Sequence, residues 1–193
     1  DCSKLASERG MKNVFVTNGY ISREALDEIN PYLDAANVDL KSFRDDFYKK
    51  QCKASLKPVL ESIEYMKKLG IWVEVTTLII QGSNDSQEEL GNIAEFIAGL
   101  SKDIPWHISR FFPTHRFSDK SPTDMSIIEK AKEIGYRKGL RYIYPGNVLK
   151  ASETKCPECG KSLVTRSLTG VSYSGVKNGK CDSCGAVTAG VWE

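Results

Sequence analysis

Apolar and polar residues alternate along the first 146 residues with two periods, one typical of strands and one typical of helices. Short runs rich in β-branched residues predict strands, and apolar residues spaced three and four positions apart predict amphipathic helices. The predicted strands span residues 12–17, 36–41, 71–80, 106–112 and 140–144. The predicted helices span residues 1–9, 22–30, 58–69, 86–99 and 123–139. The fourth helix begins with Ser86 and Glu89, the S-x-x-E pattern of a capping box.

Strands and helices that alternate in this order predict right-handed βα units around a parallel sheet. A closed eight-stranded barrel needs ~200–250 residues, whereas this part of the chain has about 150. We therefore expect an α/β fold, a partial (β/α) barrel. From about Ala151 the helical periodicity is replaced by a segment rich in Gly, Ser and Lys. The sequence thus predicts two domains, residues 1–150 and 151–193, with a boundary between Asn147 and Glu153.

Composition excludes several classes of protein. Of the 193 residues, 40% are apolar and 27% are charged, which is typical of a folded protein and not of a disordered one. The net charge of +2 gives no bulk electrostatic reason to expect nucleic acid or an anionic membrane as a partner. No apolar run approaches the ~18 residues of a transmembrane helix. The first residues carry neither an initiator Met nor a signal pattern, which suggests a processed or fragmentary chain.

The six cysteines are distributed unevenly, since two stand alone and four form two C-x-x-C-G pairs separated by 21 residues. Paired knuckles of this kind predict a tetrahedral S4 metal site, with zinc preferred over a single iron. Because four thiolates leave no position for water or substrate, we expect a structural zinc ribbon or rubredoxin-like module. This distribution also indicates a reduced, cytoplasmic protein and not a disulfide framework. The predicted ligands are Cys156, Cys159, Cys181 and Cys184.

Polar side chains recur on consecutive predicted strands, near the carboxyl ends where parallel βα folds bind ligands. In a strand covered on both faces these positions ought to be apolar, because a buried unpaired charge costs several kcal/mol. Their recurrence predicts an enclosed polar pocket for a charged small molecule. The residues are Thr17 and Asn18 on the first strand, Asp39 and Lys41 on the second, Glu74 and Thr76 on the third, and His107 on the fourth.

Each of these residues also has a purely structural interpretation. Glu74 pairs with Lys41 or Arg110 inside the barrel in one alternative, and His107 is a hydrogen-bonded core histidine in another. Asp39 with Lys41 would then be a solvated strand end. Core packing is the expected role of Trp106, Phe111, Phe112, Cys2 and Cys52.

The strings at the strand ends resemble those of radical S-adenosylmethionine (SAM) enzymes. The chain is similar to proteins like pyruvate formate-lyase activating enzyme and, among these, to the AmmeMemoRadiSam system enzymes, which also end in two C-x-x-C-G pairs and Gly-Val-Trp. The matching strings, in chain order, are V-T-N-G-Y at 16–20, V-D-L-K at 38–41, E-V-T-T-L at 74–78, G-S-N-D at 82–85, P-W-H-I-S-R-F-F-P at 105–113 and G-V-W at 190–192. The resemblance covers essentially the whole chain.

This resemblance implies a partial (β/α)6 barrel and assigns residues to the cofactor. The D-x-K string helps to hold SAM in activating enzymes, and the T-N-G string borders the same pocket. Val16 stands where the relatives have Asp, and Gln81 stands where they have Pro, so neither position is given a role. With the polar pair of the third strand included, the candidate cofactor-binding residues are Asp39, Lys41, Thr17, Asn18, Glu74 and Thr76.

Two strings that radical SAM chemistry needs are absent from the sequence, namely the C-x-x-x-C-x-x-C that holds a [4Fe-4S] cluster and a G-G-E-type string. We therefore expect the C-terminal part of such an enzyme, inactive alone. By resemblance, the complete oxidoreductase cleaves SAM reductively to methionine and a 5'-deoxyadenosyl radical. That radical abstracts hydrogen from an unidentified substrate or a glycyl-radical protein, with electrons from a reductant such as flavodoxin or ferredoxin.

Two other functions stay open. One is a non-catalytic zinc-ribbon module that binds a partner on a degenerate βα scaffold. The other is barrel chemistry independent of SAM, with Glu74 and His107 as acid and base. A C-x-x-x-C-x-x-C string encoded upstream of Asp1 would favour the radical enzyme.

Overall fold

The computed structural model describes residues 1–114, 117–167 and 169–192. Its main sheet is entirely parallel and has the order β1-β2-β3-β4-β5, so each strand pairs with the next one in the chain. Consecutive parallel strands joined through helices are the βα units that the sequence predicts. The strands are β1 (Val14–Thr17), β2 (Ala35–Asp39), β3 (Trp72–Ile79), β4 (Trp106–Arg110) and β5 (Ile143–Gly146).

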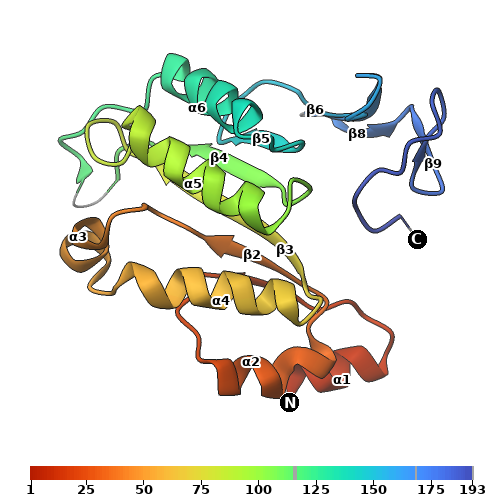
Figure 1. Ribbon diagram of the computed structural model, residues 1–193, viewed down its shortest axis with the longest axis horizontal. Helices are drawn as coiled ribbons and strands as arrows, with labels where there is room; N and C mark the ends of the chain where they lie inside the picture. Colours follow the sequence, from red (N-terminus) through yellow and green to blue (C-terminus); the bar gives the residue numbers. More distant parts are fainter. Residues whose placement is uncertain (115–116, 168, 193) are drawn as a thin grey trace.

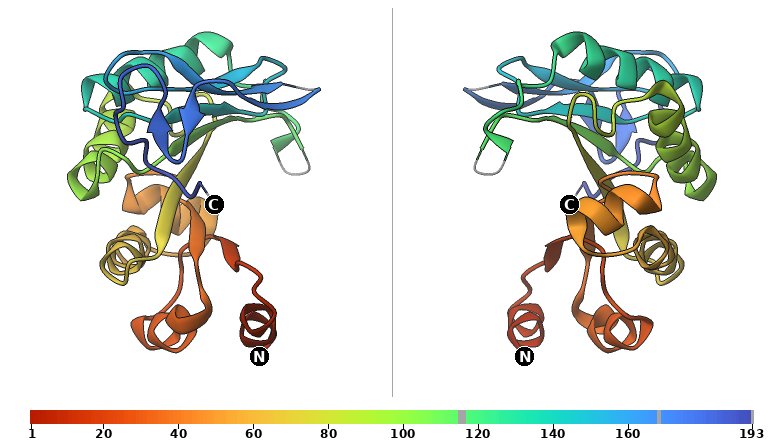
Figure 2. Two further views of the ribbon diagram at one scale, coloured as in Figure 1. Left: turned by 90° about the vertical axis from the view of Figure 1, so that its right-hand side faces the viewer. Right: turned by 90° about the vertical axis from the view of Figure 1, so that its left-hand side faces the viewer.

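Helices cover one face of this sheet, as Figures 1 and 2 show, and the other face has no helix on it among the described residues. Helix α1 (Cys2–Glu8) lies at the β1 end and has no buried residue, so Cys2 is exposed and does not pack in the core as predicted. No helix of the described residues is long and apolar enough to cross a membrane. The covering helices are α2 (Arg23–Ile29), α4 (Leu56–Lys68), α5 (Gln87–Leu100) and α6 (Met125–Arg137).

The largest hydrophobic core lies between the sheet and these helices. Strand residues alternate between faces, and those that face the helices are buried and almost all apolar. Trp106 is fully buried, as predicted, and its Nε1 donates to Thr77 Oγ1 at 3.0 Å. Phe111 is buried too, but Phe112 is 46% exposed with its ring 4.8 Å from the Arg110 guanidinium carbon, so the prediction of a core position was wrong for Phe112.

Two segments differ from the predicted elements. The last strand begins at Ile143 and not at residue 140, because Gly139 turns the chain (φ +95°) and Leu140 packs in the core before the strand starts. Between β2 and α4 the chain forms a short helix α3 (Asp45–Phe47) and a π-helical turn η2 (Tyr48–Cys52), neither of which was predicted. A 3-10 turn, η1 (Asn30–Tyr32), follows α2.

The C-terminal segment forms a small β module next to β5 (Figure 1). Its own core is small, formed by Cys156, Leu163, Val164 and Cys181, and is separate from the main core. Two antiparallel sheets make up the module. They consist of β6 (Ser152–Lys155), β7 (Ser162–Ser167) and β8 (Gly170–Tyr173), and of β9 (Val176–Lys177) with β10 (Lys180–Cys181).

Candidate functional site

Asp39 and Lys41 form an ion pair at the carboxyl end of β2. Lys41 Nζ lies 2.7 Å from Asp39 Oδ2, and the two side chains are 38% and 35% exposed, respectively. The backbone of Lys41 is held on both sides, because its N–H donates to Tyr48 Oη (3.0 Å) and its carbonyl accepts from Asn84 Nδ2 (2.6 Å). The pair is therefore accessible to a ligand while the chain that carries it is fixed.

Asn84 connects the loop after β3 to the end of β2. Its side chain is fully buried, and Nδ2 also donates to the Leu78 carbonyl at 2.9 Å. Its Oδ1 accepts from the N–H of Ile80 at 2.7 Å. A buried amide that uses both ends in this way satisfies backbone groups which the strand ends leave unpaired. No sequence pattern assigned Asn84 a role beyond its place in the G-S-N-D string.

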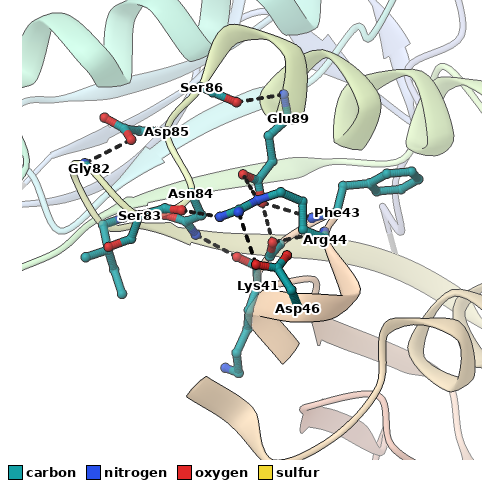
Figure 3. A network of polar contacts seen from close by, with 12 residues as sticks. Lys41, Phe43, Arg44, Asp46, Gly82, Ser83, Asn84, Asp85, Ser86 and Glu89 are labelled. Atoms are coloured by element: carbon teal, nitrogen blue, oxygen red, sulfur yellow. Dashed lines mark hydrogen bonds and ion pairs between the residues drawn. The ribbon is translucent and has the colours of Figure 1, made fainter. Parts of the chain in front are cut away.

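The buried carboxylate of Glu89 joins the loop after β2 to helix α5, as Figure 3 shows. Its oxygens accept hydrogen bonds from Ser42 Oγ, from the N–H of Phe43 (3.2 Å) and from Arg44 Nε (2.9 Å). Arg44 Nη2 in turn donates to the Ser83 carbonyl at 2.5 Å. The loops that follow β2 and β3 are thereby bound to each other at the carboxyl edge of the sheet.

This arrangement corrects the expected capping box. Ser86 Oγ accepts from the N–H of Glu89 at 3.2 Å, as an N-cap should. The reciprocal bond of a capping box does not form, because the Glu89 side chain turns to the loop after β2. The S-x-x-E spacing therefore identified the start of α5 but not the function of its glutamate.

The T-N-G string builds the tight turn that follows β1. Thr17 Oγ1 accepts from the N–H of Gly19 (3.2 Å), and Asn18 Oδ1 accepts from the N–H of Tyr20 (3.0 Å). Gly19 has φ +72°, and a Cβ there would lie 2.7 Å from Val38 Cγ1. Only glycine fits, because the turn has a left-handed backbone and packs directly on β2.

A cavity of about 480 Å³ opens beside Lys41 at this edge. Burial raises the pKa of Tyr48 to about 12 and raises the pKa of the Cys52 thiol, so both groups are neutral near pH 7. Cys52 packs partly against the core, in agreement with its expected role. The walls are mainly apolar, and the lining includes Asn18, Lys41, Tyr48, Cys52 and Ile80.

Glu74 and His107 face each other on the side of the sheet that has no helices. His107 Nε2 lies 2.6 Å from Glu74 Oε2, and Trp72 Nε1 donates to Glu74 Oε1 at 3.0 Å. Burial by itself would raise the pKa of Glu74, but the hydrogen bonds to His107 and Trp72 lower it below its usual value. An acid and an imidazole in direct contact are suited to proton transfer or to holding a polar ligand.

The predicted partners of Glu74 were wrong. Lys41 pairs with Asp39, and Arg110 Nε donates to the Thr123 carbonyl at 2.6 Å. His107 is the partner because of the register between β3 and β4. In this register His107 lies opposite Thr76, so its side chain is on the same face as Glu74 and on the neighbouring strand. Thr76 itself donates to Asn37 Oδ1 at 2.6 Å.

The four C-terminal cysteines converge on one point. Their Sγ atoms all lie within 4.8 Å of one another, with Cys156 and Cys184 at 3.6 Å and Cys159 and Cys181 at 3.7 Å. The two knuckles have the same fold, since the glycines after them have φ of +75° and +74° and each donates its N–H to the first cysteine carbonyl of its pair. The N–H of Cys159 lowers the pKa of the Cys156 thiol to about 7. The donor set fits one tetrahedral metal ion.

The sequence profile of the Radical SAM superfamily matches residues 1–97, just over half of the chain. The chain belongs to the radical SAM superfamily. This confirms the resemblance drawn from the strand-end strings.

Relatives of this radical SAM chain include two proteins of Methanocaldococcus jannaschii. One is uncharacterized and is 42% identical over 190 residues, which cover 96% of this chain and 56% of that protein. The other, provisionally named a glycyl-radical enzyme activating enzyme, is 28% identical over 141 residues, covering 71% of this chain and 53% of that protein. The chain thus spans about half the length of the relatives it matches.

Solved structures share the fold at low sequence identity. A domain of a pyruvate-formate lyase-activating enzyme from Bacteroides vulgatus aligns with TM-score 0.66 and 19% identity over 76% of this chain and 88% of that one. SuiB of Streptococcus suis gives TM-score 0.61 and 11% identity over 75% of this chain and 35% of SuiB. With the four-cysteine module, these matches confirm the predicted fold class, a partial radical SAM barrel followed by a zinc-ribbon-like module.

Within this radical SAM fold, the predicted cofactor-binding residues do not form one cluster. Asn18 and Lys41 line the cavity at the carboxyl edge, and Asp39 pairs with Lys41 beside it. Glu74 lies in a different cavity, and Thr76 is two residues beyond it on β3. Thr17 caps the turn after β1. The sequence placed all of them near strand ends but could not predict this division.

The clamp centred on Glu89 makes a direct prediction. Glu89→Gln removes a buried charge that accepts hydrogen bonds from three donors, so the free energy of unfolding should fall by about 2–3 kcal/mol. The neighbouring Glu88 is exposed on the same helix turn, and Glu88→Gln should change stability by less than about 0.5 kcal/mol. Urea unfolding of both variants measures the difference, and equal losses would show that the Glu89 contacts do not stabilise the edge.

Proposed function

We propose that this chain provides the SAM-binding edge of a radical SAM enzyme, with Asp39 and Lys41 as the residues that contact the cofactor. The observation that carries the proposal is an accessible ion pair on a fixed backbone, at the carboxyl edge of a sheet in a chain of this superfamily. SuiB, which shares this fold, has been crystallised with SAM bound. This supports the proposal that a chain with this fold binds SAM.

The chemistry of the two side chains suits this cofactor. SAM carries an ammonium, a carboxylate and ribose hydroxyls, so Asp39 can accept hydrogen bonds from it and Lys41 can donate to its oxygens. Asn84 and Tyr48 keep Lys41 in place, and Asn18 borders the same cavity. When bound and reduced by one electron, SAM supplies a 5'-deoxyadenosyl radical for hydrogen abstraction. Glu74 and Thr76 lie on the open face of β3, and Thr17 ends β1 and binds the turn that follows it. All three are proposed as secondary contacts.

The cysteines of the chain do not fit a [4Fe-4S] cluster. Sulfurs on one tetrahedral zinc lie about 3.8 Å apart, given a Zn–S distance of ~2.3 Å, and the quartet sulfurs are within 4.8 Å. Thiolates of a [4Fe-4S] cluster bind different irons and lie farther apart. Cys2 is on α1 and Cys52 on η2, and neither belongs to the group of side chains placed to hold a metal ion. We propose that the cluster ligands come from a segment outside these 193 residues and that the chain alone is inactive.

The remaining parts of the proposal follow from the relatives. We propose an oxidoreductase in the cytoplasm that abstracts hydrogen from a glycyl-radical protein or another substrate, as the name of one relative suggests, with electrons from flavodoxin or ferredoxin. We also propose that residues 1–150 and 151–193 are separate domains, because each has its own hydrophobic core. The quartet is proposed to hold zinc.

Binding of SAM to the chain tests the proposed site. Lys41→Gln removes a charge-assisted hydrogen bond, so the dissociation constant measured by equilibrium dialysis should rise about tenfold or more. Lys49 pairs with Asp45 on an exposed helix surface, and Lys49→Gln should leave binding unchanged. Unchanged binding in Lys41→Gln, or an equal loss in both variants, would refute the assignment.

Elemental analysis tests the proposed metal. The purified chain should contain about one zinc per molecule, and Cys159→Ser should lose most of it, because three thiolates bind far more weakly than four. Cys52→Ser is the matched control, since Cys52 lies outside the quartet, and it should retain the metal. A chain that holds iron, or that holds zinc equally well in both variants, would contradict the proposal.

A second function is favoured by one contact, the 2.6 Å approach of His107 to Glu74. Acid–base chemistry independent of SAM would use this pair and would not need Asp39 or Lys41. The dialysis experiment separates the two proposals, because Lys41-dependent SAM binding is expected only for the radical enzyme.

A further inference from the structure

A second cavity, of about 600 Å³, lies where the open face of the sheet meets the C-terminal module. The sheet contributes Glu74, His107 and Tyr144 to its walls, and the module contributes Arg166, Tyr173 and Trp192. Figure 1 shows the module beside β5, and the cavity is also lined by Trp72 at the start of β3 and by Pro105 and Tyr142, which precede β4 and β5. A cavity of this volume is in the range that holds a small molecule.

A stack of planar groups crosses from the sheet to the module inside this cavity. The His107 and Tyr144 ring centroids are 5.5 Å apart, and the guanidinium carbon of Arg166 lies 5.3 Å from the Tyr144 ring centroid. Tyr144 Oη and Arg166 Nη1 both lie 2.8 Å from Oγ1 of Thr154, a buried residue of β6. Arg166 is exposed, yet its guanidinium is positioned by contacts to Thr154 of β6 and Tyr144 of β5.

The guanidinium of Arg166 has hydrogen-bonding capacity that the protein does not use. It forms no ion pair with any acidic group in the part of the chain that the structure describes, and Thr154 takes one of its five N–H donors. The carboxylate that shares the cavity, Glu74, is bound by His107 and Trp72. A cation held in a fixed position beside aromatic rings, with free donors, is suited to an anionic group of a ligand.

We propose that this cavity binds a small planar anion, an aromatic carboxylate or an aryl phosphate. Arg166 binds the anionic group, and the aromatic side chains Trp72, Tyr144, Tyr173 and Trp192 pack against the planar body. The C-terminal module then has a role in ligand binding in addition to holding its metal. Asp39 and Lys41, the proposed primary contacts of SAM, lie outside this cavity, and Glu74 is the one proposed secondary contact that lines it. Anion binding that depends on Arg166 can therefore succeed or fail independently of the proposed radical chemistry.

The metal-loaded 193-residue chain provides a direct assay. Trp72 and Trp192 line the cavity, whereas Trp106 is buried in the main core, so ligand entry should change the tryptophan emission. The probes are benzoate and phenyl phosphate, with phenol as the uncharged analogue and benzylamine as the cation. Saturable binding is expected for at least one anion, and its relative strength for the two anions shows whether carboxylate or phosphate is preferred. Phenol and benzylamine should bind at least about tenfold more weakly.

Variants of Arg166 test the assignment. Arg166→Gln should weaken anion binding about tenfold or more, and Arg166→Lys should have an intermediate effect because it keeps the charge but not the planar fork. Lys177 belongs to the same module but does not line the cavity, so Lys177→Gln is the matched control and should bind normally. An unchanged absorption spectrum of the cobalt-substituted quartet shows that each variant retains the folded module.

Three results would overturn the proposal. The first is no saturable binding of either anion to the wild-type chain. The second is phenol binding as tightly as benzoate, which would indicate apolar stacking without anion recognition. The third is anion binding that Arg166→Gln leaves unchanged, or that Lys177→Gln weakens equally.

Discussion

The one-sided cover of a parallel sheet is the constraint on which the rest of the structure depends. Side chains of β2, β3 and β4 alternate between a face packed on helices and a face without them, so the first is apolar and the second can carry polar groups. Val38, Val75 and Ile108 are fully buried on the helix side. On the other side the same strands carry Asp39, Glu74 and His107. The main core and the second cavity, which Glu74 and His107 line, are consequences of this alternation.

Buried polar side chains at the carboxyl edge give the open face its fixed geometry. Asn84 and Glu89 are both buried. Asn84 has hydrogen-bond partners on its amide oxygen and its amide nitrogen, and Glu89 has them on both carboxylate oxygens. A buried polar group without partners costs free energy comparable to a lost hydrogen bond, so each loop has one favourable arrangement. The result is that the accessible Lys41 is carried by a backbone that cannot easily move. Accessibility of the side chain and rigidity of the chain are what a cofactor-binding residue requires.

The features that the sequence predicted correctly depend on local spacing. The helix cap at Ser86, the strand parities and the fold of each C-x-x-C-G knuckle are decided within a few residues. The errors concern contacts between distant segments. Glu89 matched a capping box, yet its side chain is used by a loop about 45 residues away in the chain. The partner of Glu74 depends on the offset between β3 and β4, which no local pattern records.

The second cavity illustrates the same limit. Arg166 belongs to no sequence motif, and its position beside Tyr144 depends on how the module docks on the sheet. The central claim, that the carboxyl edge binds SAM, is tested most directly by hydrogen exchange of the chain with and without SAM. We predict slower amide exchange in residues 39–48 and 80–85 when SAM is present. Protection confined to the C-terminal module, or none at the carboxyl edge, would contradict the account.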